Sequence, residues 1–176
     1  MIAIRDIAAH DFKQVIALNE SEVLQTSPMD EDHLRSLVTL SSVHRVATVD
    51  EVVVAFLIAI ASDAPYQNDN YRWFSERFSN FLYVDRVVVR ADFSGRGVGG
   101  RLYADMFDLA QSQGIEVITC EYSIDPPNPA SRAFHSRFGF AEVGSHWVSK
   151  HSKKVSLQAL NMQAAQHHPA YGSAES

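Results

Sequence analysis

The chain has 176 residues, which suffices for one domain with a sizeable hydrophobic core and is short for two. Its net charge of −6 argues against nonspecific nucleic-acid binding, and no apolar run reaches the roughly 18 residues that a membrane span needs. We therefore expect neither nucleic acid nor membrane as a partner. The single cysteine, Cys120, excludes an intramolecular disulfide, and the N-terminus lacks a basic-then-apolar leader, so the sequence predicts a cytoplasmic location.

In the first half of the chain, apolar periodicity predicts a strand, two helices and a hairpin. The strand covers residues 2–7. His10-Asp11 is expected to cap a helix whose apolar face runs from Phe12 to Val23. A second helix follows Pro28-Met29-Asp30, and the hairpin joins residues 43–49 and 52–61.

The second half is predicted to alternate strands and helices. We expect a loop over residues 62–70, a short aromatic helix over 71–78, strands over 81–89, 115–122, 140–148 and 155–160, and helices over 98–113 and from 126 to 139. This order predicts an α/β (α+β) fold with a central mixed, mostly antiparallel sheet, one parallel pair at the cofactor site, and helices on both faces. The domain is expected to cover residues 1–160, with 161–176 as a flexible tail.

The strongest chemical signal is the loop Ser94-Gly95-Arg96-Gly97-Val98-Gly99-Gly100 between a predicted strand and a predicted helix. Glycines let backbone N–H groups approach a ligand closely, and a helix N-terminus adds donors and partial positive charge. The loop therefore favours phosphate binding over a simple tight turn. Arg96 and Arg101 would add formal charge at the loop. They belong to a local cluster with Arg86 and Arg90, which leaves an anionic ligand open or else forms a solvated face.

The same glycines also satisfy the dinucleotide pattern G-x-G-x-x-G, with Glu121 about 20 residues further on. In that pattern the first glycine follows its strand almost at once, whereas residues 90–94 intervene here. Some 80 residues also precede the loop, and too little chain follows for a second mononucleotide half. Dinucleotide binding is thus a weaker alternative.

The loop resembles the phosphate-binding motif Gln/Arg-x-x-Gly-x-Gly/Ala of the GNAT superfamily of N-acetyltransferases. Gly97 and Gly99 match its two glycines, and Val89 matches the apolar residue that ends the preceding strand. Ser94 departs from the family's Gln or Arg, so we expect backbone donors to carry more of the contact.

A second block is similar to the family's later helix, Asn-x-x-Ala-x-x-Phe-Tyr-x-x-x-Gly-Phe. The matching positions are Asn128, Ser131, Phe134, His135, Gly139 and Phe140, with His135 in place of the tyrosine that protonates the departing thiolate. The resemblance implies a GNAT-like domain that uses acetyl-CoA as co-substrate. The cofactor-binding residues it implies are Val87, Val88, Val89, Ser94, Gly95, Arg96, Gly97, Val98, Gly99, Gly100, Arg101, Asn128, Ser131, Phe134 and Arg137.

Acetyl transfer to an amine needs a base, because an alkyl ammonium with a pKa near 10 must lose a proton. Glu121 is the first candidate: it lies within an apolar strand and matches the strand glutamate of the family's ribosomal-protein N-acetyltransferases. Asp85, in the strand over 81–89, is the second. The alternatives are an ion pair with an arginine for Glu121 and a salt bridge to a helix for Asp85.

The resemblance also assigns the thioester oxygen to a backbone N–H on a strand that splays from its parallel neighbour, which we place at Val87. His135 is the candidate acid for the leaving sulfur, or else an exposed helix residue. Cys120 is expected to be a small buried hydrophobe and not an acyl carrier. The scattered histidines indicate no metal site.

The sequence leaves the acceptor open as a small-molecule or peptide amine. Tyr66, Tyr71, Trp73 and Phe74 are candidates to line its pocket, because the family places substrate contacts after the hairpin. A homodimer is possible through the late strands. The rival prediction from another class is a non-catalytic acyl-CoA-binding regulatory module that has kept the cofactor loop.

Overall fold

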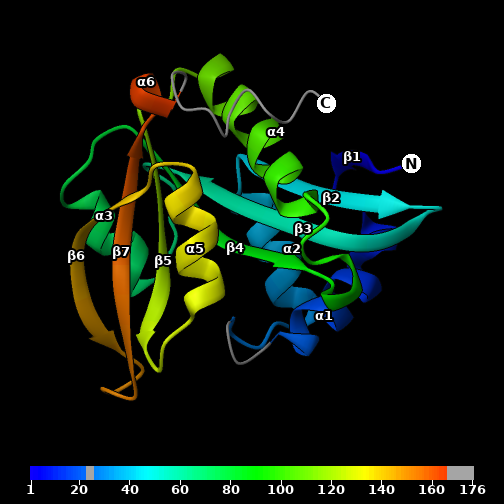
Figure 1. Cartoon of the computed structure of the whole chain (residues 1–176), viewed down its shortest axis with the longest axis horizontal. Helices are drawn as coiled ribbons and strands as arrows, with labels where there is room; N and C mark the ends of the chain where they lie inside the picture. Colours follow the sequence, from blue (N-terminus) through cyan, green and yellow to red (C-terminus); the bar gives the residue numbers. More distant parts are fainter. Residues whose placement is uncertain (23–25, 166–176) are drawn as a thin grey trace. The chain divides into compact units, whose positions relative to one another are not determined.

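The computed structural model describes residues 1–22 and 26–165. Along the chain these form β1 (Ala3–Asp6), α1 (Phe12–Ser21), α2 (Glu31–Leu40), β2 (Val43–Val49), β3 (Val52–Ala61), α3 (Asp69–Ser75), β4 (Phe81–Val89), α4 (Val98–Ser112), β5 (Val117–Asp125), α5 (Pro129–Arg137), β6 (Ala141–Val148), β7 (Lys153–Asn161) and α6 (Met162–Ala165) (Figure 1). Short 3₁₀ turns, η1 (Ala9–Asp11) and η2 (Ala91–Phe93), precede α1 and follow β4.

The strands follow the order β1-β2-β3-β4-β5-β7-β6. β4 and β5 are parallel, with residues 81–83 opposite residues 117–119, whereas β1–β2, β2–β3, β5–β7 and β6–β7 are antiparallel. The predicted α/β class with a mixed, mostly antiparallel sheet and one parallel pair is therefore confirmed. The described chain divides into two compact units, Met1–Ile60 with Val84–Leu109, and Ala61–Tyr83 with the residues from Ala110 onward.

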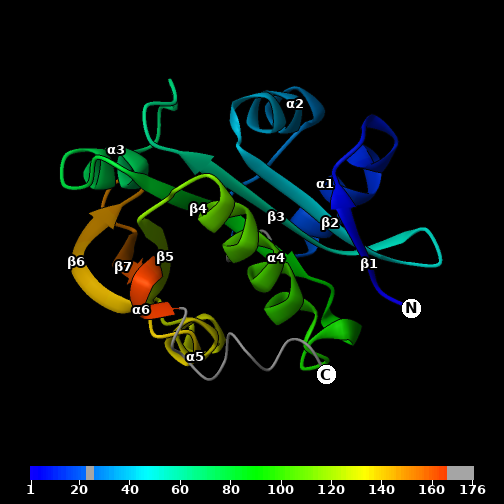
Figure 2. The ribbon, with the colours of Figure 1, turned by 90° about the horizontal axis from the view of Figure 1, so that it is seen from above.

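In the first unit, α1 and α2 cover one face of β1–β3 and α4 covers the other (Figure 2). Because both faces are covered, β3 reads as a continuous apolar run, and residues 53–60 are all buried. From α4, the buried side chains recur at helical spacing: Val98, Leu102, Tyr103, Met106, Phe107 and Ala110.

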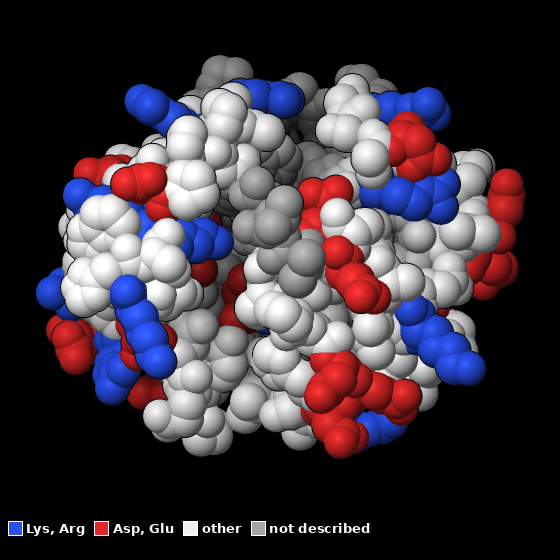
Figure 3. All heavy atoms as spheres, turned by 90° about the horizontal axis from the view of Figure 1, so that it is seen from below, with Lys and Arg blue, Asp and Glu red and all other residues white. Residues whose placement is uncertain are grey.

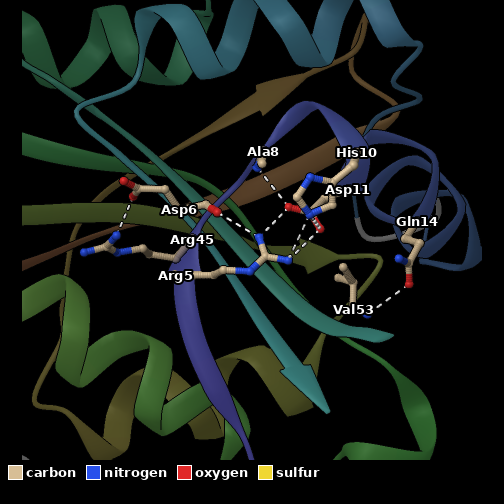
Figure 4. Close-up of polar contacts among 8 residues, drawn as sticks. All are labelled: Arg5, Asp6, Ala8, His10, Asp11, Gln14, Arg45 and Val53. Atoms are coloured by element: carbon tan, nitrogen blue, oxygen red, sulfur yellow. Dashed lines mark hydrogen bonds and ion pairs between the residues drawn. The ribbon is translucent and has the colours of Figure 1, made fainter. Parts of the chain in front are cut away.

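Around β1, an ion pair replaces the helix cap expected from the sequence (Figure 4). Asp11 is fully buried, but its carboxylate makes no capping bond to α1. It accepts two hydrogen bonds from Arg5, at 2.6 and 2.9 Å, and one from the Ala8 N–H at 2.8 Å. The carboxylate thus ties β1 to η1, and the Arg5 guanidinium holds the pKa of Asp11 below its usual range.

In the second unit, α3 and α5 lie on opposite faces of β5, β7 and β6 (Figures 1 and 2). α3 packs on β6 through Trp73, whose ring leaves no room for a side chain at Gly144: a Cβ there would lie 2.4 Å from Trp73 Cζ2. Asn70, which is also on α3, is within 2.6 Å of His146 Nε2 on β6.

Several predicted boundaries need correction. α3 begins at Asp69, because Asn68 accepts a hydrogen bond from the Tyr71 N–H and caps it, and it ends at Ser75. β5 continues to Asp125, and α5 begins only at Pro129. The start of the predicted tail forms the end of β7 and α6, where Met162 and Ala165 are buried. Val23 and the rest of the predicted tail lie outside the described residues.

Candidate active site

The glycine loop joins β4 to α4 in the first unit. Gly95 and Gly97 have φ of +74° and +76°, which only glycine adopts without strain. The Arg101 N–H donates to Gly97 O at 3.0 Å, so the N–H groups of residues 98–100 precede the first backbone bond of α4. A Cβ built on Gly95, Gly97 or Gly100 would meet nothing within 4 Å. The loop therefore pairs open space with a helix N-terminus, an arrangement that fits phosphate oxygens.

The structure divides the arginine cluster. Arg86 is buried, and Arg90 forms an ion pair with Asp92 at 2.7 Å, which lowers the pKa of the Asp92 carboxyl. Arg96 is exposed, with its guanidinium 5.3 Å from the centre of the Phe93 ring, and Arg101 is exposed on the first turn of α4. Of the four arginines, Arg96 and Arg101 are thus the two that can offer charge to an anion at the loop.

Along β4, Val88 is buried, and Val87 and Val89 are half-buried. The strand also carries Asp85, whose carboxylate lies 2.7 Å from Arg86 Nε. Both side chains are at most 5% exposed. Asp85 therefore forms a buried ion pair with its chain neighbour, and this pairing favours a structural role for Asp85 over that of a base.

Glu121 lies on β5 in the second unit, half-buried. Its Oε1 accepts a hydrogen bond of 2.9 Å from the hydroxyl of Tyr83, on the neighbouring strand β4. Neither of the two expectations for Glu121 included this tyrosine hydroxyl as a partner. Sequence reasoning missed Tyr83, because the two residues are 38 positions apart and only the pairing of β4 with β5 brings them together.

The packing around His135 also disfavours the role expected of it. It is 3% exposed, and its ring stacks on Tyr122 and meets Phe140 edge to face, with ring centres 6.1 and 5.3 Å apart. Its Nδ1 lies 2.8 Å from Ser131 O, and burial lowers the pKa of the imidazole. A neutral ring whose Nδ1–H donates to the backbone is a poor proton donor near pH 7, so these contacts favour a packing role.

Of the other α5 candidates, Asn128 and Ser131 lie at the start of the helix, Phe134 lies in its second half, and Arg137 ends it. Asn128 caps α5 by accepting a hydrogen bond from the Ser131 N–H at 3.2 Å. Phe134 is half-buried and packs edge to face on Phe138, and Arg137 is exposed in the last turn, where a cation suits the helix dipole.

The aromatic residues after the hairpin separate into two groups. Tyr66 and Tyr71 line a surface groove of about 510 Å³ together with residues 67–69, 72 and 75. Both rings also pack on Tyr83, with centres 6.5 and 5.8 Å away, so the groove wall adjoins the tyrosine that binds Glu121. Trp73 instead packs on β6, and Phe74 is fully buried in the core.

Further sequence predictions concern Cys120, metals and charge. Cys120 is buried, as expected of a small buried hydrophobe, and burial raises the pKa of its thiol well above the usual value. Within residues 1–22 and 26–165, we find no group of three or more His, Cys, Asp or Glu side chains suited to a metal ion, and no helix long and apolar enough to cross a membrane. Figure 3 shows acidic and basic side chains interspersed over one face.

Comparison with known proteins gives a match to the family model described as Acetyltransferase (GNAT) family, over residues 3–140. A curated relative, phosphinothricin N-acetyltransferase of Streptomyces coelicolor, is 38% identical over 60 residues, which is about a third (34%) of each chain.

Among solved structures, the ribosomal-protein-S18-alanine N-acetyltransferase of Escherichia coli is similar, with a TM-score of 0.69, 16% identity, and coverage of 92% of this chain and 94% of that one. The YncA structure from Salmonella typhimurium, which contains acetyl-CoA, has a TM-score of 0.69 and 18% identity, with 92% and 94% coverage. At these identities the two structures establish the shared fold.

Proposed function

Because the chain belongs to the acetyltransferase (GNAT) family, we propose that it is an N-acetyltransferase that transfers the acetyl group of acetyl-CoA to a primary amine. The observation that carries the proposal is the glycine loop. Positive φ at Gly95 and Gly97, open space at Gly100 and the start of α4 together suit a diphosphate.

In this proposal, the chain holds acetyl-CoA through the first unit. Backbone N–H groups of residues 95–100 bind the phosphates, with Arg96 and Arg101 adding charge. The Val87 N–H donates to the thioester oxygen, where negative charge grows as the bond to the amine forms. When bound, acetyl-CoA supplies a carbonyl carbon that accepts the amine nitrogen and a sulfur that departs as the bond to carbon breaks.

Glu121 is our proposed base. It takes the proton that the amine nitrogen must lose, directly or through water. The hydrogen bond from Tyr83 fixes Oε1 and supports the charged carboxylate, which is the form that accepts a proton. We assign the groove beside Tyr66 and Tyr71 to the acceptor, since its wall packs on Tyr83.

The test is turnover of acetyl-CoA with a panel of small amines and N-terminal peptides. Glu121→Gln should retain affinity for CoA and lose about 100- to 10,000-fold in turnover. The loss should shrink as the pH rises, because more of the amine arrives neutral. Glu116→Gln is the matched control, since Glu116 is exposed just before β5 and should be silent.

Three other outcomes have distinct meanings. Wild-type protein that binds CoA but acetylates no amine would favour the non-catalytic regulatory module. Retention on an NAD resin but not on a CoA resin would favour dinucleotide binding. A Glu121→Gln variant with wild-type turnover from pH 6 to 9 would remove Glu121 as the base. Cytoplasmic location and homodimerisation stay predictions.

A further inference from the structure

Arg86 is a buried residue of β4 that makes polar contacts with several residues of the first unit. Its Nε donates to Asp85 at 2.7 Å, and its Nη1 donates to Asn19 Oδ1 at 3.1 Å and to Ser27 O at 3.3 Å. Its Nη2 donates to Ser27 Oγ at 3.2 Å, and Met29 Sδ lies 3.6 Å from Nη1. The guanidinium therefore joins three segments: α1, residues 27–29 before α2, and β4.

The side chains that contact Arg86 are buried or make further hydrogen bonds with one another. Asn19 is 1% exposed, and its Nδ2 donates to Ser27 O at 2.9 Å, so Ser27 O receives two hydrogen bonds. The side chains of Asp85 and Arg86 are 3% and 5% exposed. The cluster thus joins the buried side chains of Asn19, Asp85 and Arg86 to the exposed residue Ser27, and Arg86 is next in the chain to Val87.

Stability alone does not explain this cluster. Taking two charges out of water costs several kcal/mol per ion, and apolar residues of similar volume often give equal or greater stability. A planar guanidinium does provide something that apolar residues lack, namely five donors in fixed directions. Here those donors fix the backbone at Ser27 and the side chains of Asn19 and Asp85 at once.

We propose that Arg86 is a positioning residue for acyl transfer: through Asp85, Asn19 and Ser27 it fixes β4 at Val87 and holds Ser27 against that strand. This inference rests on the proposed function, in which the Val87 N–H binds the thioester oxygen. A misplacement of about 1 Å in such a donor can cost about 100-fold in rate.

The test is the double variant Asp85→Asn/Arg86→Met, which removes both charges, keeps the volume and leaves no unpaired buried ion. We expect kcat to fall about 10- to 100-fold. KM for acetyl-CoA should stay within about twofold, and Tm within about 4 °C, the size of a 1 kcal/mol effect. The single variant Arg86→Lys keeps the charge but lacks the planar guanidinium, so its kcat should lie between those of the double variant and the wild type.

The matched control is Arg5→Met/Asp11→Asn, which removes another arginine–aspartate pair of the same unit, at β1 and η1 (Figure 4). It should lower Tm and leave kcat per folded molecule unchanged. If wild-type protein acetylates amines and Asp85→Asn/Arg86→Met does so equally well, the inference is overturned and the proposed function stands.

If wild-type protein shows no turnover, the proposed function fails and the role in acyl transfer fails with it, and hydrogen exchange then tests the structural part of the inference, that Arg86 fixes β4 at Val87. Faster exchange at the Val87 amide and at residues 26–30 in the Asp85→Asn/Arg86→Met variant, at equal global stability, supports positioning by Arg86. Equal exchange in the two proteins refutes it.

Discussion

Gly100→Ala tests the cofactor loop without disturbing the fold. Gly100 lies in the first turn of α4 with φ outside the left-handed region, and an added Cβ meets nothing within 4 Å. The substitution therefore introduces no clash. Alanine is favoured over glycine in a helix interior by about 0.8–1.0 kcal/mol, so stability should stay level or rise by up to that amount.

In contrast to stability, the affinity of Gly100→Ala for CoA should fall. A helical Cβ tilts toward the helix N-terminus, and that is the side from which phosphates would approach residues 98–100. We expect Gly100→Ala to weaken CoA binding at least about 10-fold, which corresponds to about 1.4 kcal/mol. A pantetheine fragment without phosphates should lose much less.

Gly97→Ala is the contrasting variant. At φ +76° an alanine costs about 1–2 kcal/mol, so this change should lower both stability and CoA affinity. Calorimetry with CoA and pantetheine gives the affinities, and urea unfolding gives the stabilities. A Gly100→Ala protein that is folded and binds CoA within twofold of wild type would refute the assignment of the loop.

Two further predictions concern stability. Arg5 lowers the pKa of Asp11, so the pair stabilises the fold above the ordinary carboxyl pKa of 3.8, and this contribution disappears as the pH falls through the lowered value. Asp11→Asn should cost about 1.5–3 kcal/mol at pH 7 and progressively less below pH 4 in urea unfolding, and a constant difference down to pH 2 would contradict the argument. Gly144→Ala should cost about 1–3 kcal/mol, because its Cβ would lie 2.4 Å from the Trp73 ring. Adding Trp73→Leu should restore most of the lost Tm, and an unchanged Tm in Gly144→Ala alone would exclude the clash.

The sequence by itself determined the features that depend only on residues close together in the chain. Alternation and helical spacing predicted most of the strands and helices, and the glycines of residues 95–100 predicted the loop between β4 and α4. These signals are local because side-chain periodicity and positive φ arise within a few residues. The errors were local as well. The predicted range of α3 began too late in the chain, because the capping residue Asn68 has the composition of a polar loop.

Only the tertiary structure decided which partner each polar side chain has. Arg86 belonged to a sequence cluster of four arginines that left an anionic ligand open, yet its guanidinium donates to Asn19 and Ser27, 67 and 59 residues away. His135 stands at the position of the tyrosine that protonates the thiolate in the family, yet its ring packs against Tyr122 and Phe140. Charge and spacing in a sequence do not reveal burial, and burial fixes whether an ionisable group pairs inside the protein or meets a ligand.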